Sequence, residues 1–181
     1  GNEFQKAIEC FTKSIELNTD NSLSYNNRGL VYCLIKDFDK GLRDLNKAIE
    51  LKPDEYKYYN NRGSLKMNKK DYAGGIADFN QSILLSPYFT EAYSNRGLAK
   101  SHIGDFVGAL EDSNIAIKLN PDSARFYINR GLLMHSNKDF KSALMDFDKA
   151  LELSPNTAEG FGNRANTKLR LSDYEGAMTD F

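Results

Sequence analysis

Hydrophobic and polar positions recur with a period of 34 residues along the chain. Within one period, the spacing of four and three between Tyr25, Gly29 and Tyr32 places small and aromatic groups on one helix face. After a short polar turn, a second pattern of helical spacing follows in Phe38, Leu42, Leu45 and Ile49. A fixed period of this size indicates one supersecondary unit copied along the chain. The pattern therefore predicts repeated helix–turn–helix units.

Proline and aspartate mark the ends of these units. A proline cannot continue a helix interior, so four prolines spaced by 34 residues mark the joints: Pro53, Pro87, Pro121 and Pro155. Before each second helix an aspartate can accept a hydrogen bond from a free backbone N–H: Asp37, Asp71, Asp105, Asp139 and Asp173. We expect a single solenoid over 1–181, with full repeats 22–55, 56–89, 90–123 and 124–157 between partial repeats 1–21 and 158–181. Neither end has a polar capping repeat, so we expect a fragment of a longer protein.

Each first helix carries an Asn-Arg-Gly tripeptide, and in the last copy alanine replaces glycine. Glycine in a helix costs about 1 kcal/mol relative to alanine, so its recurrence indicates close approach of the paired helices. Small residues stand at one phase of each second helix too: Gly41, Gly75, Ala109, Ala143 and Ala177. We expect large residues to fill the space between units: Phe11, Leu45, Phe79, Phe147 and Phe181. Ser113 breaks this series and predicts a looser or wetter core, so Ser113→Leu or Ser113→Phe should raise the melting temperature.

The arginine of the tripeptide needs a partner, because an unpaired charge in a helix interface is costly. An aspartate stands sixteen residues after each arginine: Asp44, Asp78, Asp112, Asp146 and Asp180. In the leading partial repeat, which has no first helix, the same phase holds Cys10, and this favours pairing within one repeat. We expect a buried or half-buried Arg–Asp pair in every repeat. The alternative is an arginine row for phosphate or carboxylate ligands.

These recurring positions together resemble the tetratricopeptide repeat over essentially the whole chain, in an Asn-Arg-Gly variant. The resemblance implies an all-α fold, a right-handed superhelical solenoid of antiparallel helix pairs. The sequence departs from the family in two respects. Tyr25 and its equivalents stand where the family usually has tryptophan, and Arg28 and its equivalents stand where it commonly has leucine.

In this family one side of the first helix lines a concave groove. Asn27 lies about 200° around the helix from Tyr25, on that side. The expected peptide-binding face is an asparagine ladder with its neighbours: Asn27, Asn61, Asn95, Asn129, Asn163, Leu30, Lys57, Ser64, Leu98, Arg125 and Leu132. An asparagine offers one acceptor and two donors, so a row of them can bond the backbone of an extended peptide. The alternative is that these amides bond between adjacent helices and hold the stack together.

The chaperone-binding subtype of the family needs a lysine one residue before the ladder position. We expect no chaperone carboxylate clamp, because none of the five repeats has a lysine there. The residues at that position are Asn26, Asn60, Ser94, Ile128 and Gly162. Tyr88 and Phe89 follow Pro87, where other joints are polar, and they form either a contact patch or, as we expect, a contact with the next helix.

The charge composition argues against nucleic acid and acidic membranes as partners. With 24 basic and 25 acidic residues the net charge is −1, which provides no field to attract nucleic acid or an acidic membrane. The sequence contains no signal pattern and no bilayer-spanning stretch. We expect Cys10 and Cys33 to be free thiols in a reducing compartment, with a disulfide between them as the alternative, and we therefore expect a cytoplasmic protein. His102 and His135 lack accompanying ligands at metal-binding spacing, and no phosphate-loop or nucleophile motif occurs. We therefore expect no metal, no cofactor and no catalytic site.

The resemblance implies a protein–protein interaction scaffold or adaptor that binds an extended or helical segment of a protein partner in its groove. Two alternatives stay open. One is a structural module whose open ends stack, with weak self-association. The other is the substrate-selecting arm of an enzyme whose catalytic domain lies outside this chain.

Overall fold

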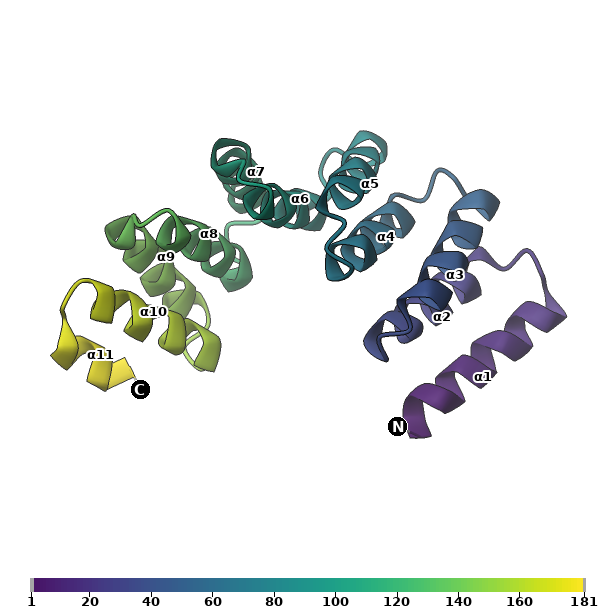
Figure 1. Ribbon diagram of the computed structural model, residues 1–181, viewed down its shortest axis with the longest axis horizontal. Helices are drawn as coiled ribbons and strands as arrows, with labels where there is room; N and C mark the ends of the chain where they lie inside the picture. Colours follow the sequence, from purple (N-terminus) through teal and green to yellow (C-terminus); the bar gives the residue numbers. More distant parts are fainter. Residues whose placement is uncertain (1, 181) are drawn as a thin grey trace. The chain divides into compact units, whose positions relative to one another are not determined.

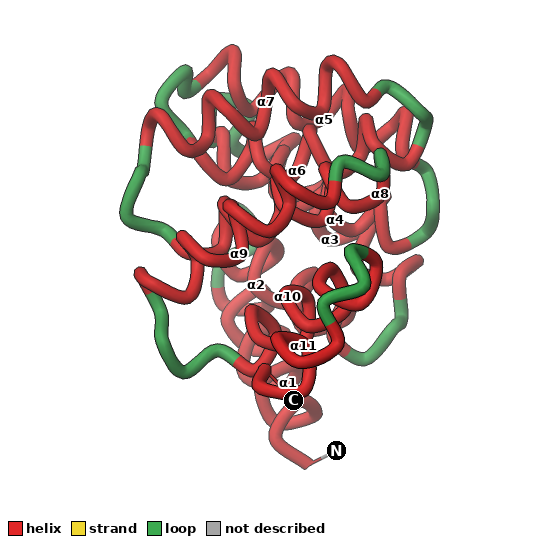
Figure 2. Tube along the Cα trace, turned by 90° about the vertical axis from the view of Figure 1, so that its left-hand side faces the viewer, coloured by secondary structure: helices red, strands yellow, loops and turns green. Residues whose placement is uncertain are grey.

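The computed structural model describes residues 2–180, which form eleven α-helices and no strand (Figure 1). Short loops join consecutive helices along the chain (Figure 2). The chain divides into two compact units, Gly1–Ala92 and Tyr93–Phe181, whose boundary falls inside one helix.

The N-terminal unit consists of five helices and the start of a sixth. They are α1 (Asn2–Leu17), α2 (Ser22–Leu34), α3 (Phe38–Leu51), α4 (Tyr56–Asn68), α5 (Tyr72–Leu85) and the first residues of α6 (Thr90–His102). Helix α2 packs against α3, and α4 packs against α5. The two pairs contact each other through α3 with α4 and through α2 with α4, and the unpaired helix α1 contacts α2. The unit is therefore a stack of helix pairs.

The C-terminal unit repeats this arrangement. It contains the rest of α6, then α7 (Phe106–Leu119), α8 (Ala124–Ser136), α9 (Phe140–Leu153), α10 (Ala158–Arg170) and α11 (Tyr174–Asp180). Helices α8 and α9 pair, as do α10 and α11, and α8 contacts α10 in the next pair. The predicted all-α solenoid of helix pairs is confirmed.

The predicted aspartate caps are present at every second helix from α3 onward. The carboxylate accepts a hydrogen bond from the backbone N–H three residues on, as with Asp71 and Gly74 at 2.9 Å. The residue before each cap adopts a positive φ, near 63° at Lys36 and 84° at Gly104. A left-handed residue is a common way to end a helix. Only one of these five positions is glycine, so the sequence alone did not reveal them.

Glycine and a large side chain pack together between the two helices of a repeat. A Cβ added to Gly63 would lie 2.7 Å from Cε1 of Phe79, and Gly131 has the same relation to Phe147. Phe79, Phe147 and Leu45 are fully buried. The prediction of close helix approach is confirmed, but these large side chains reach the glycine of their own repeat and do not only fill the space between units. Phe11 is only partly buried, and Phe181 lies outside the described residues.

The aromatic pair after Pro87 behaves differently from the expectation. The Phe89 ring packs edge-on against Tyr56 of α4 at 4.8 Å between centroids, in the preceding first helix. Tyr88 is 82% exposed. The expected contact of both residues with the next helix is therefore wrong for Tyr88, and for Phe89 the partner is an earlier helix.

Candidate functional site

The arginine of every repeat binds the aspartate sixteen residues later. In Arg62, Nε donates to Asp78 Oδ2 at 2.9 Å and Nη2 donates to Asp78 Oδ1 at 2.6 Å. The same two-pronged bond joins four other pairs: Arg28–Asp44, Arg96–Asp112, Arg130–Asp146 and Arg164–Asp180. The aspartate side chains are at most 10% exposed. The predicted buried or half-buried pair within each repeat is confirmed.

The arginines also make a contact that the sequence analysis missed. The remaining nitrogen, Nη1, donates to the second helix of the preceding repeat, as from Arg62 to Asn46 at 2.8 Å. Three more such bonds reach Thr12, Asn114 and Asp148. The available signal was a polar residue sixteen positions before each arginine. Each of these arginines is bonded through three nitrogens and links its own repeat to the preceding one. The hydrogen bonds to Asp146 raise the pKa of Arg130 above its ordinary value, although burial acts in the opposite direction.

The ladder asparagines lie half-buried on the first helices. Asn61 Nδ2 donates to Asn26 Oδ1 at 2.8 Å, and Asn129 Nδ2 donates to Ser94 Oγ at 2.9 Å. In both bonds the acceptor stands one residue before the ladder position of the preceding repeat. Bonds between adjacent helices, which the sequence analysis left as an alternative, are thus present at these two positions. Within the described residues, the Oδ1 atoms of Asn61 and Asn129 accept no hydrogen bond.

Asn163 differs because the residue at the acceptor position of the preceding repeat is Ile128. Its Nδ2 is buried and has no hydrogen-bond partner among the described residues, as is true of His135 Nε2. Both side chains line a pocket of about 210 Å³ with Leu132, Phe147 and Asn166. Burial, and then the charge of Arg170, lowers the pKa of His135, which favours its neutral form.

Two ladder substitutions should therefore affect folding differently. Asn129→Ala removes a hydrogen bond and leaves the buried Ser94 hydroxyl without its partner, so it should lower the free energy of unfolding by about 1 kcal/mol. Asn163→Ala removes an amide whose Nδ2 has no hydrogen-bond partner among residues 2–180, and it should cause no loss. Urea denaturation of both variants compares them directly. Equal losses would contradict this difference in bonding.

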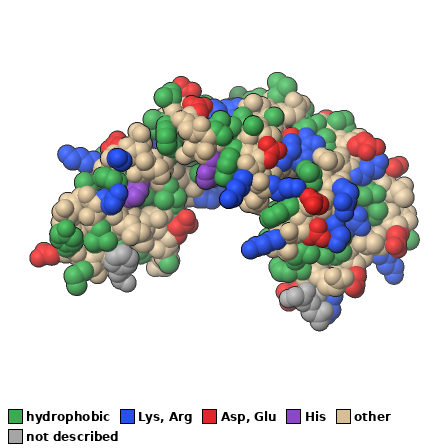
Figure 3. All heavy atoms as spheres, viewed as in Figure 1, with side chains coloured by type: hydrophobic (Ala, Val, Ile, Leu, Met, Phe, Trp, Pro, Cys, Tyr) green, Lys and Arg blue, Asp and Glu red, His purple; other side chains and the backbone are tan. Residues whose placement is uncertain are grey.

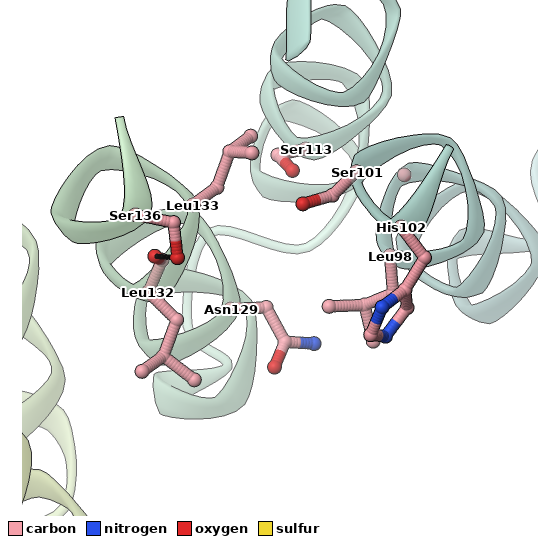
Figure 4. A pocket seen from close by; sticks show the side chains of 9 residues that line it. Leu98, Ser101, His102, Ser113, Asn129, Leu132, Leu133 and Ser136 are labelled. Carbon is pink, nitrogen blue, oxygen red and sulfur yellow. Dashed lines mark hydrogen bonds between the residues drawn. The ribbon is translucent and has the colours of Figure 1, made fainter. Parts of the chain in front are cut away.

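The structure brings three of the predicted site residues together. Leu98, Asn129 and Leu132 border a pocket of about 230 Å³, whose other lining residues are Gly97, Ser101, His102, Ser113, Leu133 and Ser136. Figure 4 shows Leu98, Ser101 and His102 on α6, Asn129, Leu132, Leu133 and Ser136 on α8, and Ser113 on α7 behind them. Ser101, Leu133 and Ser136 were not predicted. The break at Ser113 was the signal for this pocket.

The other predicted site residues are more scattered. Leu30 and Ser64 are half-buried, and Ser64 Oγ donates to the backbone oxygen of Asn60 at 3.0 Å. Lys57 and Arg125 are exposed, and each cation lies over an adjacent aromatic ring, at 5.7 Å from Tyr56 and 5.2 Å from Phe126. Asn27 Oδ1 accepts a bond from Asn26 Nδ2 at 3.0 Å, and Asn95 is half-buried like the rest of the ladder.

The face shown in Figure 3 carries charges of both signs in each unit. Among residues 2–180, no three histidine, cysteine, aspartate or glutamate side chains are grouped so that they could hold a metal ion. Neither Cys10 nor Cys33 is in a disulfide. No described helix combines the length and the apolar character that crossing a membrane requires.

Three family models described as tetratricopeptide repeat match residues 22–55, 56–89 and 94–158. No curated protein is significantly similar in sequence. Several solved structures share the fold. A tetratricopeptide repeat protein from Parabacteroides merdae has a TM-score of 0.84 at 22% identity, over 99% of this chain and 70% of that chain.

Two further structures are similar at comparable coverage. PilF of Pseudomonas aeruginosa has a TM-score of 0.83 at 14% identity, over 99% of this chain and 82% of its own. YrrB, described as a tetratricopeptide repeat protein with an unusual peptide-binding site, has a TM-score of 0.68 at 21% identity, over 96% of this chain and 89% of its own. At such identities the similarity shows the fold alone.

Proposed function

The chain belongs to the tetratricopeptide repeat family, and from this premise we propose that it is an interaction scaffold whose first helices bind an extended or helical segment of a partner protein. The asparagine ladder contacts the backbone of that segment. The family is typically involved in protein interactions, and we assign that interaction to the ladder asparagines of this chain.

One observation carries the proposal. Asn61 and Asn129 are each fixed by a single hydrogen bond from Nδ2, while their Oδ1 atoms accept none within the described residues. An amide that is already held in place loses little side-chain freedom when a ligand binds. Its oxygen can accept a bond from a peptide N–H, which every residue except proline provides. Such contacts favour recognition of a backbone, largely independent of sequence.

A random-peptide display library supplies probes for this proposal. Peptides selected on the wild-type chain are measured by fluorescence polarisation against a variant with Asn61, Asn95 and Asn129 all changed to alanine. We expect at least a tenfold loss of affinity for that variant. Glu111→Ala, Lys118→Ala and Asp122→Ala together are the matched control, because these exposed polar side chains lie on or just after a second helix.

Folding has to be measured in parallel, because the ladder also links adjacent helices. Circular dichroism and urea denaturation show whether the triple variant remains folded. If it does not, Asn163→Ala is measured in its place, because the Nδ2 atom of Asn163 has no hydrogen-bond partner among the described residues. Peptides that bind the folded triple variant as tightly as the wild type would overturn the ladder's role.

A further inference from the structure

The repeats themselves show which side chain is missing beside Gly97. At the equivalent phase, Phe79 packs on Gly63 and Phe147 packs on Gly131, with ring atoms 2.7 to 3.0 Å from the position of an added Cβ. At Gly97 the nearest side-chain atoms to such a Cβ are Asp112 Cβ at 3.3 Å and Ser113 Oγ at 3.4 Å. A serine thus stands where two other repeats bury a benzyl group.

The space next to Ser113 is the pocket of about 230 Å³ between α6 and α8. A cavity of about 150 Å³ lined by apolar side chains is known to accept benzene, so this volume is sufficient for a phenyl ring. Leu98, Leu132 and Leu133 provide apolar walls. The Ser113 hydroxyl donates to the backbone oxygen of Ala109 at 2.9 Å, so it does not require a polar occupant.

This pocket shares residues with the face that the proposed function assigns to the peptide. Asn129 and Leu132 belong to that face and line the pocket as well, and in Figure 4 the Asn129 side chain points toward Leu98 and His102 across it. Asn129 Oδ1 accepts no bond within the described residues. A peptide N–H bonded there would place its side chain next to the pocket.

We infer that this pocket receives an aromatic side chain of the bound partner segment, which takes the place of the ring that Phe79 and Phe147 supply in their own repeats. The inference rests on the proposed function and adds a specific anchor to it. The ladder recognises the backbone, whereas the pocket selects phenylalanine or a similar side chain at one position.

Capped amino acids test the pocket without any knowledge of the partner. N-acetylphenylalanine amide is titrated into the full chain, and the methyl resonances of Leu98, Leu132 and Leu133 are followed by NMR. We expect saturable shifts with the phenylalanine probe and at least tenfold weaker binding of the lysine analogue. Absence of such shifts, or equal binding of the lysine analogue, would overturn the inference.

Substitutions at Ser113 distinguish filling of the pocket from its removal. Ser113→Phe should abolish binding of the probe and raise the melting temperature, because the ring occupies the pocket from within. Ser113→Ala leaves the space open and should retain binding. If Ser113→Phe fails to fold, Ser113→Leu, which imitates Leu45, takes its place. Unchanged probe binding in the filled variant would be evidence against this site.

The display-selected peptides separate this inference from the proposed function. Selection of an aromatic residue at one position, lost on Ser113→Phe, supports the anchor. Peptides that lose affinity for the asparagine variant but not for Ser113→Phe would leave the proposed function intact and overturn the pocket. Peptides that bind both variants as tightly as the wild type would overturn both the pocket and the proposed function. Dimerisation of the wild type that Tyr88→Ala and Ser113→Phe each abolish would identify Tyr88 of a second copy as the occupant and overturn the partner segment.

Discussion

Replacing Asp78 by alanine is expected to lower the free energy of unfolding by about 3–5 kcal/mol. The Asp78 side chain is 5% exposed and accepts bonds from Arg62 on both oxygens. Lys66 Nζ lies 2.8 Å from its Oδ2 as a second cation. Removing the carboxylate leaves both cations largely out of water without a counter-charge. Urea denaturation of the full chain measures the loss.

Asp39→Ala is the matched control in the same unit. Asp39 accepts a bond from Lys69 Nζ at 2.7 Å, but its side chain is 77% exposed. Solvent screening makes surface pairs weak, so this substitution should have a far smaller effect. A similar loss in the two variants would show that the Asp78 pair behaves as a surface pair, which contradicts its burial.

The Arg–Asp pairs could be predicted from spacing because both partners recur in every repeat at a fixed separation. The third bond of Arg62 could not be predicted as easily, because its acceptor Asn46 belongs to the preceding repeat. Which residues of adjacent repeats face each other depends on how the helix pairs are stacked. The polar residue sixteen positions earlier becomes meaningful only when that stacking is known.

The ladder shows the same limit of sequence reasoning. The 34-residue period puts the five amides at one phase of the first helices, and in the structure all five are half-buried. Whether an amide is bonded depends on the residue one position before the ladder in the neighbouring repeat. Asn26 and Ser94 can accept a hydrogen bond there, and Ile128 cannot. The identity of that residue was visible in the sequence, but its role required the geometry of the adjacent helices.

Helix boundaries followed from local chemistry. The cap at Asp71 was predictable because an aspartate before an apolar pattern is a common helix start. The left-handed residue Lys70 beside it was not, since lysine has no preference for that conformation. The pocket at Ser113 was predicted only as a loose core. Its apolar walls arise where α6 and α8 approach each other, and spacing within one helix does not contain that information.

Truncation of Phe79 should be the most damaging change in the apolar core. Phe79 is fully buried against Gly63, and removal of a buried phenylalanine side chain costs about 3–5 kcal/mol through lost burial and the cavity that remains. Phe79→Ala should therefore lower the free energy of unfolding by that amount. A loss of less than about 0.5 kcal/mol, which is usual for surface substitutions, would contradict its packing.

Gly63→Ala offers a sharper test of the same contact. Alone, it should destabilise the chain, because its Cβ would lie 2.7 Å from the Phe79 ring, and overpacking costs about 1–3 kcal/mol. In the Phe79→Ala background the ring is absent, so the same substitution fills space and gains about 1 kcal/mol of helix propensity. The effect of Gly63→Ala should thus change sign between the two backgrounds. A double-mutant cycle by urea denaturation measures the interaction, and additive effects would show that Gly63 and Phe79 are not in contact.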